Sequence, residues 1–382
     1  MGKLITALIL ILILSTTPVS AQGTFVTTYT NDGFAGNWAS NRFIRQSSSA
    51  IGEFNQEKGI IHTQYVISGS AEDEINQAID DLEGIGGIVE LSKGEFPITA
   101  SGVHYIKLHQ SNVILEGQGQ DTILYGMSGG NNVIVELLAL EGEQVENVGI
   151  RNLVITGAPD SYVCGLGIGT LDITGTLTNA FAEDLWIHDV AWHPDVGGGK
   201  GITMGSFEVG SVDGVCLNRI KVWDCDFYGI DTSHNYVTGG IRNLEIENTC
   251  ILRSNQHNLY ILGVDGVRIN NVTTNDSVNR NGAVFNFCND VRIRRLRSTG
   301  NGARGFLAGQ SSNLNIRYSL FKDNESSGAD IDDCTGYIYL FRSRVIGNEV
   351  GMDVDNSIVR LRWTVVRNNE LDYRVINGGE IY

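Results

Sequence analysis

The C-terminal half of this chain repeats itself at a near-constant interval. Glycines that open short segments recur in equal steps of 23, at Gly282, Gly305, Gly328 and Gly351. A second series of apolar residues runs in phase, in steps of 23 or 24: Ile246, Ile269, Ile293, Ile316 and Leu340. Self-similarity at a fixed period of this size predicts a solenoid. Residues one period apart then become neighbours in adjacent coils, about 4.8 Å apart if the coils pair as parallel strands.

The residues between the repeats select the kind of solenoid. β-branched residues alternate with polar ones, and the chain has 4 prolines against 47 glycines. A leucine-rich repeat would need a dense leucine signature, which this sequence lacks. Asparagine tolerates left-handed backbone and stacks in ladders, and it marks the expected turns: Asn255, Asn258, Asn279, Asn281, Asn301, Asn324, Asn348, Asn368 and Asn369. We therefore predict an all-β chain that forms a single-stranded right-handed parallel β-helix.

One helix is expected, at the N-terminal end of the solenoid. Ser70 is its predicted start, Asp73 occupies the capping-box position, and an apolar stripe follows at helical spacing: Ile75, Ala78, Ile79 and Leu82. Such a helix would keep the open end of the stack out of water. Because a solenoid grows as one unit, residues 68–382 are predicted to be one β-helix domain. Residues 22–67 have no clear period and form an N-terminal extension of uncertain structure.

Residues 1–21 have the features of a secretory signal peptide. Lys3 precedes a short apolar run, and the small residues Val19, Ser20 and Ala21 form a cleavage site. The run is too short to span a bilayer, and no later stretch qualifies. The alternative is an anchor that remains uncut. We expect a secreted monomer, extracellular or at the cell surface, without a membrane span.

The charge balance and the cysteines narrow the partners further. The formal net charge is −17, from 27 basic and 44 acidic residues, which argues against a nucleic-acid partner. Secretion would permit disulfides between the six cysteines. Their spacing does not place obvious pairs in adjacent coils, and we expect buried free thiols.

The earlier coils are less regular than the later ones. Wider and unequal intervals separate the strand signals at Leu115, Ile155, Ile187 and Val222. The excess residues are expected in loops on one side of the stack, and in solenoids such loops cluster on the binding face.

The polar stretch from Trp186 to Arg280 is the candidate region for a site. His234, His257 and Arg280 follow one another in the same steps of 23, so an unbroken register would place them in one column. An inert turn ladder is the alternative interpretation of these three residues.

Residues 227–234, Phe-Tyr-Gly-Ile-Asp-Thr-Ser-His, resemble the Tyr-Gly-Phe-Asp-Pro-His motif of alginate (mannuronan) C5-epimerases. The similarity extends over roughly residues 220–300, and residues 71–98 resemble the N-terminal cap of pectate-lyase-like β-helices. The resemblance implies functional roles for Tyr228, Asp231, His234 and Arg280. Two positions depart from the family. The histidine is shifted by one residue, and His257 stands where the family has an aspartate.

This residue set fits proton removal from C5 of a uronic acid. The charge that develops on the sugar carboxylate needs a cation, supplied by Arg280 or Lys200. His234 or His257 is the candidate base. Tyr228 would return a proton from the opposite face, which gives epimerisation, whereas protonation of the C4 oxygen would give a lyase.

Supporting and competing sites complete the set of candidates. Asp231 would orient a histidine, and Trp192 is a candidate for stacking on a sugar, whereas Trp186 is expected in the core. The stretch His188, Asp189, His193 and Asp195 matches no helical zinc motif, so no metal site is predicted. An acidic column formed by Asp330, Asp332, Asp353 and Asp355 is expected to be a solvated edge, with Ca²⁺ as a possible ligand. No cofactor is required.

Two functions remain open at this point. The first is a secreted enzyme that modifies uronate-containing glycans by C5 proton abstraction, as an epimerase or a lyase. Its partner would be an acidic polysaccharide or a cell-surface glycan. The second is a non-catalytic β-helix that binds glycans or forms part of the cell envelope.

Overall fold

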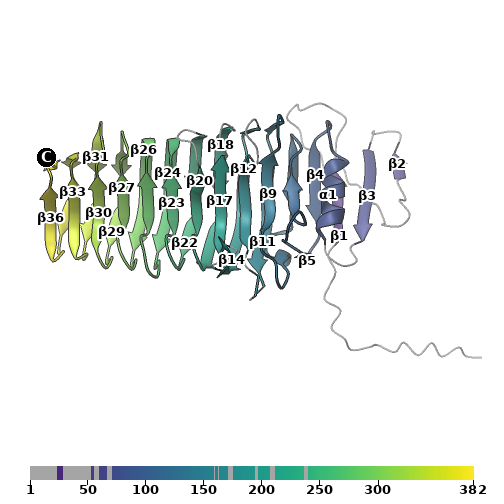
Figure 1. The fold of residues 1–382 in the computed structure, drawn as a ribbon, viewed down its shortest axis with the longest axis horizontal. Coiled ribbons are helices and arrows are strands. Elements are labelled where there is room, and N and C mark those ends of the chain that lie inside the picture. Colours follow the sequence, from purple (N-terminus) through teal and green to yellow (C-terminus); the bar gives the residue numbers. More distant parts are fainter. Residues whose placement is uncertain are drawn as a thin grey trace, which may run out of the picture.

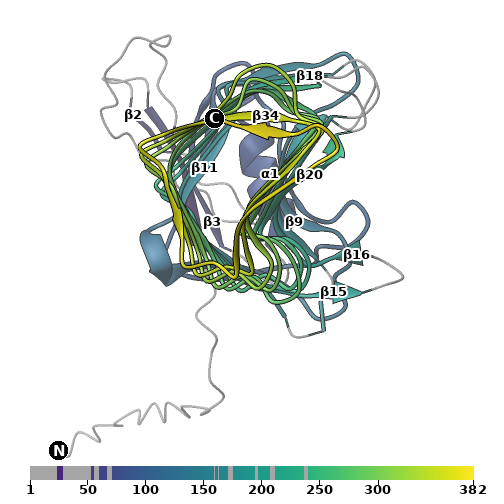
Figure 2. The ribbon, with the colours of Figure 1, turned by 90° about the vertical axis from the view of Figure 1, so that its left-hand side faces the viewer.

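The computed structural model describes residues 24–28, 53–55, 60–66, 71–158, 160–161, 163–170, 175–193, 197–206, 211–235 and 240–382. The predicted signal peptide lies outside these residues. The described chain winds into a row of stacked β coils, with one helix at the N-terminal end (Figure 1). Viewed along the stack, each coil has three sides (Figure 2). The prediction of an all-β parallel helix with an N-terminal helix is confirmed.

One side of the described coils is an 11-stranded parallel sheet, which we call face A. Its strands are β6 (Ile106–Leu108), β9 (Val133–Ala139), β12 (Cys164–Thr170), β17 (Lys200–Ser206), β20 (Ile230–Asn235), β23 (Leu259–Leu262), β25 (Ala283–Asn286), β27 (Phe306–Gly309), β30 (Ser327–Asp332), β33 (Val350–Asp355) and β36 (Leu371–Ile376).

The other two sides, faces B and C, belong to one larger sheet whose long strands bend from one face to the next. Face B contains β4 (Gly87–Leu91), β7 (Val113–Glu116), β10 (Gln144–Glu146), β13 (Thr176–Thr178), β18 (Ser211–Asn218), β21 (Ile241–Glu247), β28 (Asn315–Arg317), β31 (Ile338–Phe341), β34 (Ile358–Arg362) and β37 (Glu380–Ile381). Face C contains β5 (Gly94–Ile98), β8 (Thr122–Gly126), β19 (Lys221–Cys225), β22 (Cys250–Leu252), β29 (Leu320–Lys322), β32 (Arg344–Ile346) and β35 (Val365–Arg367), with the 3-10 turn Gly119–Asp121 before β8.

Four strands run across both faces: β11 (Gly149–Gly157), β14 (Phe181–Val190), β24 (Val264–Asn275) and β26 (Asn289–Thr299). Each contains a residue with positive φ where it changes face: Asn152, Asp184, Asn271 and Arg295. Left-handed backbone at one position turns the chain without breaking the sheet, and Asn and Asp adopt it more readily than most residues.

The periodic apolar ladder is the core of the later coils. The strand register joins Ile246 to Ile269 and continues coil by coil to Leu340, and all five members are buried. The glycine series occupies the tight entry into face A. A Cβ atom on Gly328 would lie 2.4 Å from a methyl carbon of Val345 and 2.9 Å from the Gly351 carbonyl oxygen. The glycine series is therefore a packing requirement.

Part of the predicted asparagine series forms a ladder beside the glycines, buried at Asn301, Asn324 and Asn348 and half-buried at Asn369. The side-chain amide of Asn301 donates to Asn324 at 2.8 Å, Asn324 donates to Asn348 at 2.9 Å, and Asn348 donates to Asn369 at 3.0 Å. None of these four residues has a positive φ. Their role is hydrogen bonding between coils, while left-handed backbone falls at other positions such as Asn243.

The N-terminal helix α1 (Glu72–Asp80) covers the end of the stack, and its predicted apolar stripe is buried. The predicted capping box is wrong: the N-cap is Ala71, without a side-chain cap hydrogen bond, and Ser70 lies outside the described residues. Strand β1 (Thr24–Thr28) pairs antiparallel with β4 and with β3 (Ile60–Val66), and β2 (Glu53–Asn55) pairs with β3. Segments of the N-terminal extension thus add strands to the first coil.

The predicted strand spacing in the early coils was partly wrong. Leu115 pairs with Ile150 on face B, whereas Ile155 pairs with Leu124 and Ile187 on face C. The interval from Leu115 to Ile155 therefore joined residues of two different faces. The steps to Ile187 and then Val222 follow the register. The connections next to β12, β17 and β20 contain residues outside the described part of the chain, so the loops expected there stay a prediction.

Two expectations from composition can be compared with the described residues. All six cysteines are free thiols, and Cys225, Cys288 and Cys334 are buried. Ser311 occupies the coil between Cys288 and Cys334, and its hydroxyl accepts the Cys288 N–H at 3.0 Å. No helix in the described part of the chain is long and apolar enough to cross a bilayer.

Candidate active site

Three side chains of face A occupy equivalent positions in successive coils. Lys200, Tyr228 and His257 each stand at the entry to a face A strand. The Gly201 N–H donates to the Tyr228 carbonyl, and the Gly229 N–H donates to the His257 carbonyl, both at 3.0 Å. This column brings together an amine, a phenol and an imidazole that are far apart in the sequence.

Aromatic rings pack closely around this column. The ring centroids of Tyr228, His257 and Tyr260 are 5.3–5.4 Å from one another, and all three pairs are stacked. Phe227 packs on Tyr228 with centroids 4.1 Å apart, and Trp192 stacks on Phe227 at 5.4 Å. Trp192 is 39% exposed. The cluster therefore runs from a half-buried centre to an exposed aromatic rim.

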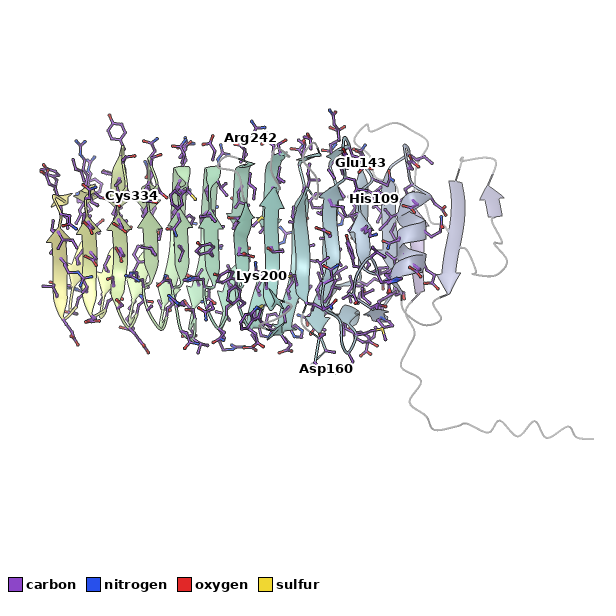
Figure 3. All side chains as sticks on the ribbon, viewed as in Figure 1. His109, Glu143, Asp160, Lys200, Arg242 and Cys334 are labelled. Atoms are coloured by element: carbon purple, nitrogen blue, oxygen red, sulfur yellow. The ribbon has the colours of Figure 1, made fainter. Side chains whose placement is uncertain are left out.

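A buried ion pair lies next to the rings. Lys200 Nζ is 3.1 Å from Asp231 Oδ2, and the two side chains are 8% and 0% exposed. The same Nζ lies 5.6 Å from the centroid of the Tyr228 ring. Figure 3 marks Lys200 on the coil stack. Burying two charges costs several kcal/mol in desolvation, which the attraction between them only partly offsets.

The surroundings fix the protonation states of Tyr228 and His257. Burial, and then the negative charge of Asp231, raise the pKa of Tyr228 to about 12. Burial, and then the positive charge of Arg280, lower the pKa of His257 to about 4. Near neutral pH the site therefore holds a protonated phenol beside a neutral imidazole.

A backbone contact also fixes the tautomer of His257. The N–H of Asn281 donates to His257 Nδ1 at 3.3 Å. A neutral imidazole has one donor and one acceptor nitrogen, so the proton lies on Nε2. Through that nitrogen, the neutral His257 ring is a hydrogen-bond donor.

Arg280 lies near the column but outside it. The backbone register places Asn281 beside His257 in the next coil, and Arg280 Nε donates to Gln256 Oε1 at 3.2 Å. The expected column of His234, His257 and Arg280 is therefore wrong. Arg280 still acts at the site electrostatically, since its charge lowers the pKa of both Tyr228 and His257.

An irregularity in β20 bears on the shifted histidine. The register pairs Thr203 with Asp231 and Gly205 with His234, so three residue steps on β20 match two on β17. Such a bulge absorbs one extra residue. In the family motif the histidine follows the aspartate by two residues. Because of the bulge, the backbone of His234 lies at the position that a residue two places after Asp231 would take in a regular strand. The His234 side chain lies outside the described residues.

Two aromatic residues of the cluster were not identified from the sequence. Tyr260 pairs with Asp231 across adjacent coils, and Phe227 precedes Tyr228. Leu259 is the equivalent of Ile230 in the next coil, and Tyr260 is the equivalent of Asp231. Aligning Ile230 with Leu259 in the sequence would therefore place Tyr260 beside Asp231. The irregular interval between those coils concealed this equivalence.

The competing candidates lie apart from the column. His188 on β14 contacts Asp189 at 2.7 Å and stacks on Trp223, on face C. Asp195 and the side chain of His193 lie outside the described residues. Among the described side chains, no group of three or more His, Cys, Asp or Glu residues is placed to hold a metal. The predicted core role of Trp186 is wrong. Leu185 and Ile187 on either side of it are buried, so Trp186 lies on the outer face of β14.

The acidic column is present, but half of it is not a solvated edge. The register joins Asp330 to Asp353 and Asp332 to Asp355. Asp330 and Asp353 are 6% and 5% exposed, and they pair with Arg304 and Arg374. Both carboxylates are thus compensated within face A.

Comparisons with known proteins agree with this fold. A family model described as "Right handed beta helix region" matches residues 207–370. The chain is a right-handed parallel β-helix. No curated protein sequence matches it.

Solved structures share the fold at low sequence identity. The A-module of mannuronan C-5 epimerase AlgE4 from Azotobacter vinelandii aligns with a TM-score of 0.61 and 15% identity, covering 82% of this chain and 95% of that one. The AlgE6 A-module from the same organism gives 0.59 and 17%, covering 82% and 94%. Tailspike protein 2 of an Escherichia coli O157:H7 bacteriophage gives 0.58 and 10%, covering 82% and 40%.

Proposed function

We propose that this protein modifies uronate-containing polysaccharides outside the cytoplasm by abstracting the proton from C5 of the sugar. One observation carries the proposal. The buried Lys200–Asp231 pair lies directly beside the stacked rings of Tyr228 and His257 on face A. Structural stability alone does not account for a buried charge pair, because desolvation offsets its attraction.

The first step of the proposed reaction needs stabilisation of negative charge. Removing the C5 proton moves an electron pair toward the sugar carboxylate. The Lys200 ammonium and the nearby Arg280 guanidinium would stabilise this charge, and His257 Nε2–H would donate to a carboxylate oxygen. The fixed tautomer of His257 favours this donor role over the role of base. His234 is then the proposed base.

The second step decides the product. The Tyr228 phenol is protonated near neutral pH, so it has a proton to give. Delivery of that proton to C5 from the opposite face inverts the centre. Tyr228 then regains a proton from water, and His234 releases the abstracted proton to water. If the C4 oxygen leaves with a proton instead, an unsaturated sugar forms. Asp231 holds the Lys200 ammonium in place for either outcome.

Independent support comes from sequence and fold. Residues 227–234 resemble the motif of mannuronan C5-epimerases, and the two A-modules that share the fold carry that activity in their names. The β20 bulge offsets the one-residue shift of the histidine. The sequence features of a secretory signal agree with an extracellular or cell-surface substrate.

A direct experiment is incubation with polymannuronate and, separately, polygalacturonate in deuterated buffer. Recovered polymer should carry deuterium at C5 if the centre is deprotonated and reprotonated. An ultraviolet-absorbing unsaturated end would identify a lyase. If neither signal appears with either polymer over a range of pH and calcium concentration, the enzymatic proposal is wrong.

The ring cluster also suits a second function, glycan binding without turnover. The stack from Trp192 through Phe227 to Tyr228 offers aromatic surface of the kind on which sugars pack. Polymer binding that Trp192→Ala weakens, together with no C5 exchange, would favour this alternative.

A further inference from the structure

A row of outward positions on face B, at its border with face C, changes character along the stack. In the early coils the row alternates in charge: Arg151 lies between Glu116 and Glu183. Arg151 pairs with Glu116 at 2.8 Å, and Arg219 pairs with Glu183 at 2.5 Å. Opposite charges on neighbouring strands stabilise a sheet.

In the later coils the same row carries arginines that face one another. The register places Arg294 directly beside Arg317, followed by Phe341 and Arg362. Within the described residues, the ion pairs of these coils involve other side chains and leave these three arginines without a carboxylate partner. Like charges directly opposite each other destabilise a sheet. The arrangement therefore costs stability unless an external anion compensates it.

Aromatic rings lie beside arginines of these later coils. Arg294 lies 5.9 Å from the centroid of Tyr318, and Arg342 and Arg362 lie 4.8 and 4.5 Å from that of Trp363. Tyr318 is 43% exposed and Trp363 is 61% exposed. Stacking on a ring orients a guanidinium without removing its charge, and its N–H edges remain able to bind a carboxylate in a bidentate way.

The charge distribution of the whole chain agrees with this local pattern. Residues 261–382 contain 15 basic and 14 acidic side chains, whereas the preceding residues contain 12 and 30. The chain is acidic overall, so the late coils are its electrostatically favourable region for an anion.

We propose that Arg294, Arg317, Arg342, Arg362, Tyr318 and Trp363, here named the arginine surface, bind an acidic polysaccharide at a site separate from face A. Exposed rings and guanidinium edges that recur at the coil spacing suit a chain of sugar rings with one carboxylate each. This inference rests on the proposed function for the identity of the ligand. Its effect would be to retain long polymers on the protein while face A acts on them.

Nucleic acid fits these observations less well. Binding a phosphate backbone depends on a broad basic footprint, and the net charge of −17 opposes it. A preference for single-stranded DNA over polyuronate at equal salt would overturn the assignment of the ligand.

The test compares two triple variants of the full chain. The first is Arg294→Gln/Arg317→Gln/Arg362→Gln. The matched control is Arg219→Gln/Arg242→Gln/Arg253→Gln, which removes the same charge from arginines that are 48–50% exposed but already ion-paired. Figure 3 shows one of these, Arg242, at the edge of the stack and away from Lys200. Binding is measured by fluorescence anisotropy with labelled polymannuronate.

The first variant should bind long polymannuronate at least about tenfold more weakly than the wild type, as expected for three exposed charge contacts. Its thermal midpoint should stay unchanged or rise, because stacked like charges are removed. The control should bind within about twofold of the wild type. Equal affinity of the first variant and the wild type would overturn the inference.

Exchange at C5 in short oligouronates separates this inference from the proposed function. Lost polymer binding without any C5 exchange, even in the wild type, would leave the arginine surface standing and remove the enzymatic proposal. If the first variant shows normal C5 exchange and unaltered polymer binding, the enzymatic proposal stands and the arginine surface is removed as a binding site.

Discussion

Substitutions of Lys200 and Asp231 test whether their buried ion pair stabilises the fold around the candidate site. Lys200→Met should lower the free energy of unfolding by about 3–5 kcal/mol, because Asp231 would keep a buried charge without its ammonium partner. Lys200→Met/Asp231→Asn should recover most of that loss, since neither charge remains. Urea unfolding measures both. A single variant as stable as the wild type would show that the pair does not hold this part of face A together.

His257 gives the site a defined response to pH. Its pKa lies near 4 in the folded chain, below the ordinary value of 6.5, so the unfolded chain binds more protons between these values. Stability should therefore decrease as the pH falls from about 6.5 to 4, by at most about 1.4 kcal/mol per pH unit. Histidine titration by NMR checks the pKa directly.

A substitution separates the two causes of the His257 shift. Arg280→Gln should raise the pKa of His257, because one of the two lowering effects is removed. Arg242→Gln removes a charge from face B and should leave that pKa unchanged. An unaltered His257 pKa in Arg280→Gln would mean that burial alone sets it.

The asparagine ladder shows how one element holds successive coils together. Asn324 accepts from Asn301 and donates to Asn348. Asn324→Ala should cost about 2 kcal/mol, because its buried partners lose hydrogen bonds. The exposed Asn279→Ala, which interrupts one surface hydrogen bond to Asn255, should change stability by less than about 0.5 kcal/mol. Similar losses in both variants, measured by urea unfolding, would contradict the ladder as a structural element.

The elements that could be predicted from sequence are those with local or periodic causes. The ladder from Ile246 to Leu340 follows from burial repeated in every coil, and the stripe of α1 follows from the helical period. The link from Leu115 to Ile155 failed because face B and face C strands have similar apolar patterns. The side of the coil on which a residue falls depends on left-handed corners such as Asn152, which composition does not locate.

The sequence predicts which residues belong to the candidate site better than it predicts how they are arranged. Tyr228, His257 and Lys200 do meet on face A, but His257 neighbours Asn281 instead of Arg280 in the next coil. Spacing alone treats each coil as equal in length, whereas the bulge in β20 and the 24-residue step from Leu259 to Ala283 change the number of residues per coil. The tautomer of His257 depends on a backbone N–H from another coil, which no sequence pattern specifies.

At the scale of the whole molecule, the ring cluster and the arginine surface lie on different sides of one stack of coils. The irregular coils carry the ring cluster on face A, and the regular coils carry the arginine surface on face B. A polymer long enough to contact both would be held by many weak interactions, so its affinity should increase with chain length.

The most direct test of the central claim is the rate of C5 deuterium incorporation into polymannuronate by Tyr228→Phe. Tyr373→Phe is the matched control, because it removes the hydroxyl of a 43% exposed tyrosine on the last face A strand. The proposed reaction predicts at least about a tenfold loss for Tyr228→Phe and no loss for the control. Equal rates in the wild type and Tyr228→Phe would contradict a catalytic role for the Lys200–Tyr228–His257 column.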